Sequence, residues 1–151
     1  MLKKLLLAAA LGSAVIISGC ESVQTVQRVS DNLQLLQNKT WIATQIGNTE
    51  IQTSPSSRNI PSIQFDEATK RVSGSDGCNR LTGAYAAGND TLNMSQLAST
   101  RMACLNNGDL AQKYNEALSK VTHYQVFGKT LKLMDRHGNL LIQYESAVQP
   151  R

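Results

Sequence analysis

From Thr40 onward, short stretches of β-forming residues alternate with turn residues, and this spacing constrains the fold more than any other feature. Pairs such as Gly47-Asn48, Gly88-Asn89 and Gly128-Lys129 interrupt the stretches. Alternation of apolar and polar residues is typical of strands with one buried face. The expected strands cover residues 40–46, 50–52, 60–65, 71–74, 80–85, 91–94, 124–127, 130–134 and 140–144. Their short connections predict hairpins and a meander, and therefore antiparallel pairing.

One helix is expected within this series, over residues 109–121. Residues 106–109 (NNGD) offer N-cap chemistry just before it. Its apolar side chains form one stripe, made of Leu110, Tyr114, Ala117, Leu118 and Val121. Several strands, one late helix and then more strands predict an α+β fold with an antiparallel sheet. The sheet must bury the stripe, either by packing the helix on one face or by letting it plug an open barrel.

The N-terminus has the features of a secretory signal. Lys3 and Lys4 precede an apolar run over residues 5–17, which is followed by Ser18-Gly19-Cys20. Such a run is too short to span a bilayer as a mature helix. A cysteine directly after two small residues resembles the bacterial lipobox, in which the thiol is acylated and becomes the new N-terminus. We therefore expect residues 1–19 to be a lipoprotein signal peptide and Cys20 to anchor the protein in the membrane. Glu21 is compatible with sorting to the outer membrane, on its periplasmic face.

Residues 20–39 are expected to form the lipid anchor and an amphipathic linker helix. Val26, Val29, Leu33 and Leu36 follow one another at spacings of three, four and three residues. A helix that packs one face on its own domain is favoured, and an oligomerising zipper is the alternative. The folded domain is then expected over residues 40–146, followed by a tail over residues 147–151.

Charge and aromatic content argue against nucleic acid as a partner. The chain has 15 basic and 11 acidic residues, and two of the basic ones, Lys3 and Lys4, belong to the expected signal peptide. The remaining 13 are scattered rather than clustered. Two Phe, one Trp and four Tyr are also too few for a surface that stacks bases.

Cys78 and Cys104 remain once Cys20 is assigned to lipid. An even pair in an oxidising compartment predicts a disulfide, with two buried free thiols as the alternative. Gly74 and Gly77 precede Cys78 and suggest positive φ angles and close backbone approach. No metal or cofactor is expected, because the cysteines are not in a Cys-x-x-Cys pair and the histidines lack ligand spacing. Turn chemistry explains the Asp and Asn residues.

Two segments around these cysteines resemble a known family. The stretch over residues 72–85 (VSGSDGCNRLTGAY) and the stretch over residues 97–104 (LASTRMAC) are similar to the signature of the META domain, the HslJ-like family. Trp41, Phe65 and the run over residues 131–141 (LKLMDRHGNLL) resemble it too. The resemblance implies a fold similar to that of a secretin pilot lipoprotein, a cracked β-barrel interrupted by a helix. The whole prediction is therefore a mainly antiparallel, open or cracked barrel-like sheet with one main helix and a short N-terminal helix.

The family resemblance also implies a function. HslJ-like proteins are small envelope proteins linked to heat induction and novobiocin resistance, with no established enzymatic activity. We therefore expect a non-enzymatic outer-membrane lipoprotein acting in envelope integrity, stress response or antibiotic resistance. The alternative is a lipid- or peptide-binding module, similar to a pilot or chaperone, for an outer-membrane partner.

The residues that could carry recognition or chemistry are few. Five flank the two cysteines, and a disulfide would bring them together: Asn79, Arg80, Thr100, Arg101 and Met102. The favoured interpretation is that Asn79 and Thr100 satisfy backbone groups at the bridged corner, and the alternative is a recognition patch. His123 and His137 could serve a hydrolase. Favourable interaction with the helix dipole explains His123 better, and turn geometry explains His137 better. No catalytic residue is assigned.

Overall fold

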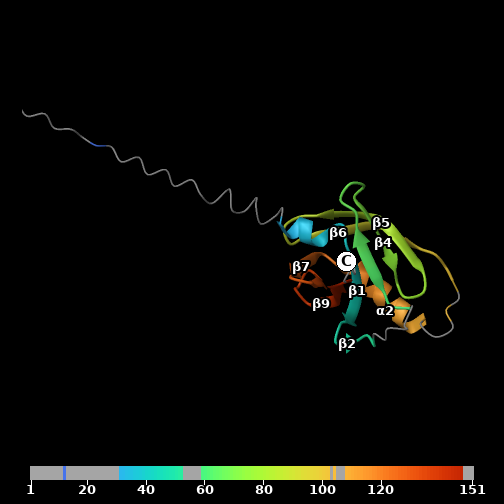
Figure 1. Ribbon diagram of the computed structural model, residues 1–151. Helices are drawn as coiled ribbons and strands as arrows, with labels where there is room; N and C mark the ends of the chain where they lie inside the picture. The colour runs from blue at the N-terminus through green and yellow to red at the C-terminus, as the bar shows by residue number, and fades with distance from the viewer. Residues whose placement is uncertain (1–11, 13–30, 53–58, 103, 105–107, 148–151) are drawn as a thin grey trace, which may run out of the picture.

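The strands form one curled antiparallel sheet in the computed structural model, which describes residues 12, 31–52, 59–102, 104 and 108–147 (Figure 1). Within these residues the strands are β1 (Thr40–Ile46), β2 (Thr49–Glu50), β3 (Ser62–Phe65), β4 (Arg71–Ser75), β5 (Arg80–Ala87), β6 (Leu92–Ser99), β7 (His123–Phe127), β8 (Thr130–Met134) and β9 (Leu140–Ser146). The main helix is α2 (Gly108–Ser119), and a short helix covers residues 31–36. The predicted α+β class and both expected helices are confirmed.

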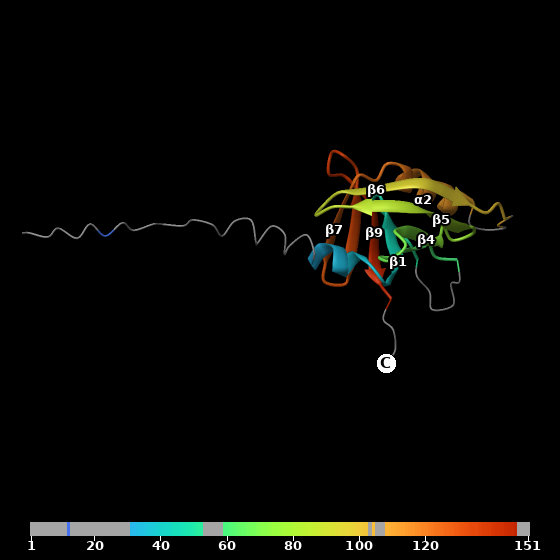
Figure 2. The same ribbon diagram turned by 90° about the horizontal axis from the view of Figure 1, so that it is seen from above.

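The sheet has the order β6-β5-β4-β3-β1-β9-β8-β7, and β2 pairs with β1. The first strand therefore lies in the middle, where its two neighbours are β3 and the last strand, β9. Figure 2 shows β5 and β6 running across β7 and β9, because the sheet is strongly twisted and curled. Its two edges, β6 and β7, approach each other at an isolated bridge between Thr91 and His123. The result is the expected open barrel.

The core lies on the inner face of the curled sheet, where α2 packs against β1 and β9. Alternate residues of β7, β8 and β9 point inward, as period-two patterning requires. The buried residues of α2 are Ala111, Tyr114, Ala117 and Leu118, which confirms most of the predicted apolar stripe. Val121 is also buried, just beyond the helix, and Leu110 is half-buried.

The short helix over residues 31–36 closes one end of the barrel. Leu36 is completely buried, and its carbonyl oxygen accepts a 2.9 Å hydrogen bond from the indole nitrogen of Trp41. Asn38 continues the attachment, because its backbone N–H donates to the Phe65 oxygen at 2.9 Å. This helix packs on its own domain, as the favoured interpretation predicts. Val26 and Val29 of the expected linker helix lie outside the described residues.

The structure extends β6 well beyond the predicted residues 91–94. Burial explains the difference, since most side chains of β6 beyond Leu92 are exposed and show no apolar alternation. An edge strand without a buried face carries no period-two signal. Its pairing with β5 also shifts register between Thr82 and Ala84. No helix among the described residues is both long and apolar enough to cross a membrane.

Candidate functional site at the disulfide corner

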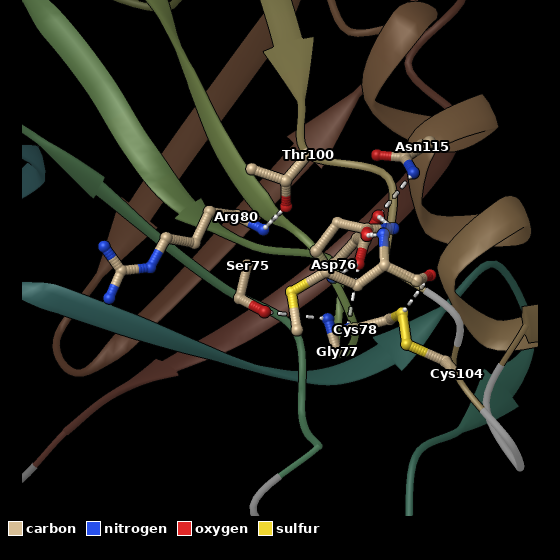
Figure 3. Close-up of a disulfide and its surroundings, with 10 residues drawn as sticks. Ser75, Asp76, Gly77, Cys78, Arg80, Thr100, Cys104 and Asn115 are labelled. Carbon is tan, nitrogen blue, oxygen red and sulfur yellow. Dashed lines mark hydrogen bonds between the residues drawn. A yellow bond between two sulfur atoms is a disulfide. The ribbon is translucent and has the colours of Figure 1, made fainter.

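The turn between β4 and β5 meets the segment after β6 at what we call the disulfide corner, made of residues 75–80, 100–102 and 104. Cys78 and Cys104 are joined there, with their Cα atoms 5.9 Å apart (Figure 3). The predicted disulfide is therefore present, and the alternative of two free thiols is excluded.

The two glycines before Cys78 serve different purposes. Gly77 has a φ of 94°, as predicted, which is costly for any residue with a Cβ. Gly74 lacks a positive φ, and that part of the prediction is wrong. Its role is close approach, because a Cβ at this position would collide with the Ser62 backbone oxygen of β3.

The carboxylate of Asp76 is the centre of the corner and is completely buried. Oδ1 accepts hydrogen bonds from the backbone N–H groups of Cys78 at 2.9 Å and Asn79 at 2.6 Å. Oδ2 accepts from the side-chain amides of Asn79 at 3.3 Å and Asn115 at 2.8 Å. Burial acts to raise the pKa of Asp76, but these donors outweigh it and hold the pKa below 3.8. Asp76 is therefore charged at neutral pH.

Asn115 comes from α2, so this bond ties the helix to the corner (Figure 3). The sequence predicts Asp76 only as a turn residue, and the two backbone bonds confirm that interpretation. Its contact with Asn115 was not predicted, because no local pattern links residues so far apart. The buried pair of Gln37 and Tyr85, whose amide nitrogen and hydroxyl lie 2.7 Å apart, was missed for the same reason.

The structure brings the five expected corner residues together. Asn79 Oδ1 accepts from the Met102 N–H at 2.6 Å, and Thr100 Oγ1 accepts from the Arg80 N–H at 3.0 Å. Asn79 and Thr100 thus satisfy backbone groups, as the favoured interpretation predicts. The side chains of Arg80 and Arg101 are exposed, and Met102 is 64% exposed. The exposed surface of the corner therefore includes two guanidinium groups and a thioether, beside Thr100.

This corner lies far from the helix over residues 31–36. The Asn32 side-chain amide donates to the Asn89 oxygen at 3.0 Å, just beyond the end of β5, whereas the corner lies at the start of β5. Seven steps of about 3.3 Å separate Arg80 from Ala87, or about 23 Å. Figures 1 and 2 both show the short helix on one side of the body and the start of α2 on the other.

The two histidines contact their neighbours in the chain. His123 belongs to β7, and its Nδ1 lies 2.8 Å from the Thr122 hydroxyl, while the expected interaction with the helix dipole stays a prediction. The ring of His137 accepts from Arg136 Nε at 3.0 Å, and its backbone N–H donates to Asp135 at 2.8 Å, as expected of a turn. The described residues contain no group of three or more His, Cys, Asp or Glu that could hold a metal ion.

Ring side chains occupy the space beneath α2. Tyr114 and Tyr144 are fully buried, and their hydroxyl oxygens lie 2.8 Å apart. Burial raises the pKa of both hydroxyls well above the usual value, so they remain neutral.

An open groove of about 730 Å³ lies where β6 and β7 approach each other, and its apolar lining includes Ala87, Leu92 and Val121.

Solved structures share this fold. A protein from Burkholderia xenovorans, determined by NMR, has 22% identity and a TM-score of 0.58, with 95% of this chain and 100% of that chain covered. A second NMR structure has 25% identity and a TM-score of 0.59, covering 74% and 92%. A DUF4847 family protein from Bacteroides vulgatus has 19% identity and a TM-score of 0.55, covering 78% and 98%. No curated protein matches the chain. The META domain family model matches residues 33–148, which include the disulfide corner and every strand described above, and the chain therefore belongs to the META domain family.

Proposed function

We propose that this META domain protein is a bacterial outer-membrane lipoprotein that acts by contact with an envelope partner rather than by catalysis. The lipobox-like Ser18-Gly19-Cys20 supports the lipid anchor, and the disulfide supports an oxidising compartment. The cellular role that the family resemblance favours is envelope integrity, stress response or resistance to antibiotics of the novobiocin type.

The observation that carries this proposal is that the body has two different ends, one that holds the N-terminal segment and one that carries the disulfide corner. Within the described residues, the chain from Cys20 is held on the body by Asn32, Leu36 and Asn38. The 12 steps from Cys20 to Asn32 span at most about 43 Å when fully extended. An acylated Cys20 would keep the body close to the membrane and leave the disulfide corner at its far end.

The corner has the properties of a recognition patch. Its backbone is held by the disulfide and by the Asp76 hydrogen bonds, so binding would cost little additional ordering. Arg and Met are enriched in protein interfaces. Arg80, Arg101 and Met102 would therefore contact an envelope protein with an acidic surface and an apolar spot.

The anchor is tested by replacing Cys20. In Cys20→Ala, we expect loss of the diacylglyceryl adduct in mass spectrometry and loss of the protein from the membrane fraction. The double variant Cys78→Ala/Cys104→Ala is the matched control and should retain both. Unchanged membrane recovery of Cys20→Ala would overturn the proposed anchor.

The patch is tested by crosslinking in membranes. Arg101→Glu/Met102→Ser should lose the crosslinked partner, whereas Arg136→Glu, an exposed cation on the turn between β8 and β9, should retain it. Equal crosslinking of both variants would argue against the corner as the contact.

The proposal assigns no catalysis to His123 or His137. Replacing both by Ala should therefore preserve the cellular phenotype, and loss of the phenotype would favour a hydrolase.

The alternative, a lipid- or peptide-binding module, is favoured by one observation, the open groove between β6 and β7. Its volume of about 730 Å³ is in the range of small-ligand sites. Protein extracted from membranes should then carry a non-covalent lipid or peptide, and Ala87→Trp, which fills the groove, should release it. Extraction without any such molecule would count against this alternative.

A further inference from the structure

Phe127 is the most exposed of the large apolar side chains that the structure describes, at 83%. It is the last residue of β7, directly before the turn at Gly128, whose φ is 60°. The hairpin does not need this ring for its own stability, because Val126 and Leu131 point into the core and are buried. The β7–β8 turn thus holds an aromatic ring in solvent on a rigid support.

Hydrogen bonds place this turn near Thr40, where the chain enters β1 after the helix over residues 31–36. The Lys129 oxygen accepts from the Ser146 N–H at 2.8 Å, and the Ala147 N–H donates to the Thr40 oxygen at 2.9 Å. The β7–β8 turn, the end of β9 and the start of β1 therefore lie at the same end of their strands. Figures 1 and 2 both show the helix over residues 31–36 beside β7.

The surface around Phe127 has the chemistry of a membrane interface. Lys129 and Lys132 are exposed nearby, and one carboxylate, Glu145, lies on β9 opposite Thr130. The outer face of the hairpin is hollowed beside the ring, with a volume of about 400 Å³ lined by Gln125, Phe127, Thr130, Lys132 and Gln143. An aromatic ring can enter the acyl boundary while amides and ammonium groups donate to headgroup oxygens.

The short connection to Cys20 makes even a weak contact effective. Linking two binding elements turns the second event into an intramolecular one, and a short flexible linker gives a high effective concentration. The segment between Cys20 and Asn32 is short, because it covers only 12 steps along the chain. The surface around Phe127, near residue 40, would therefore stay within reach of the bilayer for as long as Cys20 is anchored.

We propose that Phe127, Lys129 and Lys132 form a second contact with the phospholipid surface, so that the body rests on the membrane by its β7–β8 turn. This inference rests on the proposed acylation of Cys20. It also explains how the body would keep the disulfide corner directed away from the bilayer.

The test uses the full acylated chain in vesicles of phosphatidylethanolamine and phosphatidylglycerol. Trp41, the sole tryptophan in the sequence, is completely buried and supplies a constant background. In Phe127→Trp, we expect the new emission to shift to shorter wavelength and to be quenched by lipids with brominated acyl chains. The matched control is His137→Trp, on the exposed turn at the other end of β8, which should show neither effect.

Each outcome separates this inference from the proposed function. Failure of both variants to float with vesicles, together with an unmodified Cys20, would overturn both. Flotation with equal emission from the two variants would overturn only the Phe127 contact. A shift in native membranes but not in vesicles would identify a protein as the partner and would also overturn the lipid contact. Adding Lys129→Glu/Lys132→Glu to Phe127→Trp should reduce the shift, and an undiminished shift would overturn the role given to the lysines.

Discussion

At the scale of single residues, the corner depends on a buried carboxylate that is stabilised by donors rather than by a cation. Within the described part of the chain, the partners of Asp76 are backbone and amide N–H groups. Burying an isolated charge is costly, and donors to the ionised form compensate for lost hydration. Asp76 thereby connects the turn, the disulfide and α2.

Replacing this carboxylate should therefore be severe. In Asp76→Asn, the new amide meets the Asn115 amide donor, so at least one buried group loses its partner. We expect the free energy of unfolding to fall by about 3 kcal/mol in urea denaturation. Asn115→Ala, which removes a single bond, should cost about half as much. Equal stability of Asp76→Asn and the natural chain would contradict the role given to this residue.

The same residue predicts a pH dependence. Because the folded pKa of Asp76 is lowered below 3.8, its stabilising contribution is present above the unfolded pKa and is lost as the pH falls through the folded pKa. The natural chain should thus lose stability as the pH drops from 5 towards 2, more steeply than Asp76→Asn. Urea midpoints of both proteins measured across this range test the prediction, and midpoints that fall in parallel as the pH drops would contradict it.

Gly74 supports the sheet by having no side chain. Gly74→Ala would place a methyl group against the Ser62 oxygen and separate β3 from β4. We expect a loss of about 2 kcal/mol in unfolding free energy. Gly108→Ala, where a Cβ meets nothing within 4 Å, is the control and should be close to neutral. A neutral Gly74→Ala would show that the strands can move apart freely.

At the scale of elements, two helices complete what the sheet leaves open. The curled sheet buries its inner face only because α2 fills it and the helix over residues 31–36 covers one end. β6 shows the opposite case, an edge strand whose exposed side chains stabilise little, so its pairing with β5 must hold it. Each helix is thus needed for the core rather than added to it.

The short helix offers a matched pair of variants. Leu36 is completely buried, whereas its neighbour Leu35 is 39% exposed. Leu36→Ala should lower the unfolding free energy by about 3 kcal/mol, since it leaves a cavity at the end of the barrel. Leu35→Ala should cost less than about 1 kcal/mol. Similar losses for the two would mean that this helix is not part of the core.

The disulfide joins elements that are 26 residues apart in sequence. Closing a loop of this size restricts the unfolded chain, and the entropy model gives about 3.5 kcal/mol of stabilisation. We expect Cys78→Ala/Cys104→Ala to melt at lower temperature than the natural chain under non-reducing conditions. The reduced natural chain should melt close to the double variant. Identical melting with and without reductant would argue against this stabilisation.

At the scale of the whole molecule, the described body has one continuous core and two distinct ends. Residues from the short helix, α2 and both halves of the sheet share the hydrophobic cluster. Within the described residues, every buried side-chain nitrogen or oxygen has a hydrogen-bond partner. One end receives the N-terminal chain, and the other carries the disulfide corner. Both the proposed function and the proposed Phe127 contact depend on this difference between the two ends.

A single core predicts a single transition. Trp41 is completely buried at the junction of the short helix and β1, so its fluorescence reports on the core. We expect urea curves from Trp41 fluorescence and from far-ultraviolet circular dichroism to coincide. Separate midpoints would show that part of the sheet unfolds independently of the region around Trp41.

The local pattern of the sequence was enough to predict most strands, both helices and the antiparallel class. β1 and β8 have the predicted bounds, because alternation and flanking turns are properties of neighbouring residues. Cys78 and Cys104 were paired correctly by counting the cysteines that remain when Cys20 is expected to carry lipid. The close backbone approach expected at Gly74 is confirmed, but the positive φ is wrong, because the residue type does not show which φ angle the strand requires.

Contacts between distant residues were decided only by the tertiary structure. Asn115 reaches Asp76 because α2 packs across the inner face of the sheet, and the turn after Phe127 lies near the start of β1 because the Lys129 oxygen accepts from Ser146 at the end of β9. Periodicity encodes which face of a strand is buried, whereas the path of the chain determines which strands become neighbours. The sequence by itself therefore determined the elements and the disulfide, and the packing of the sheet around α2 determined the corner and the two ends.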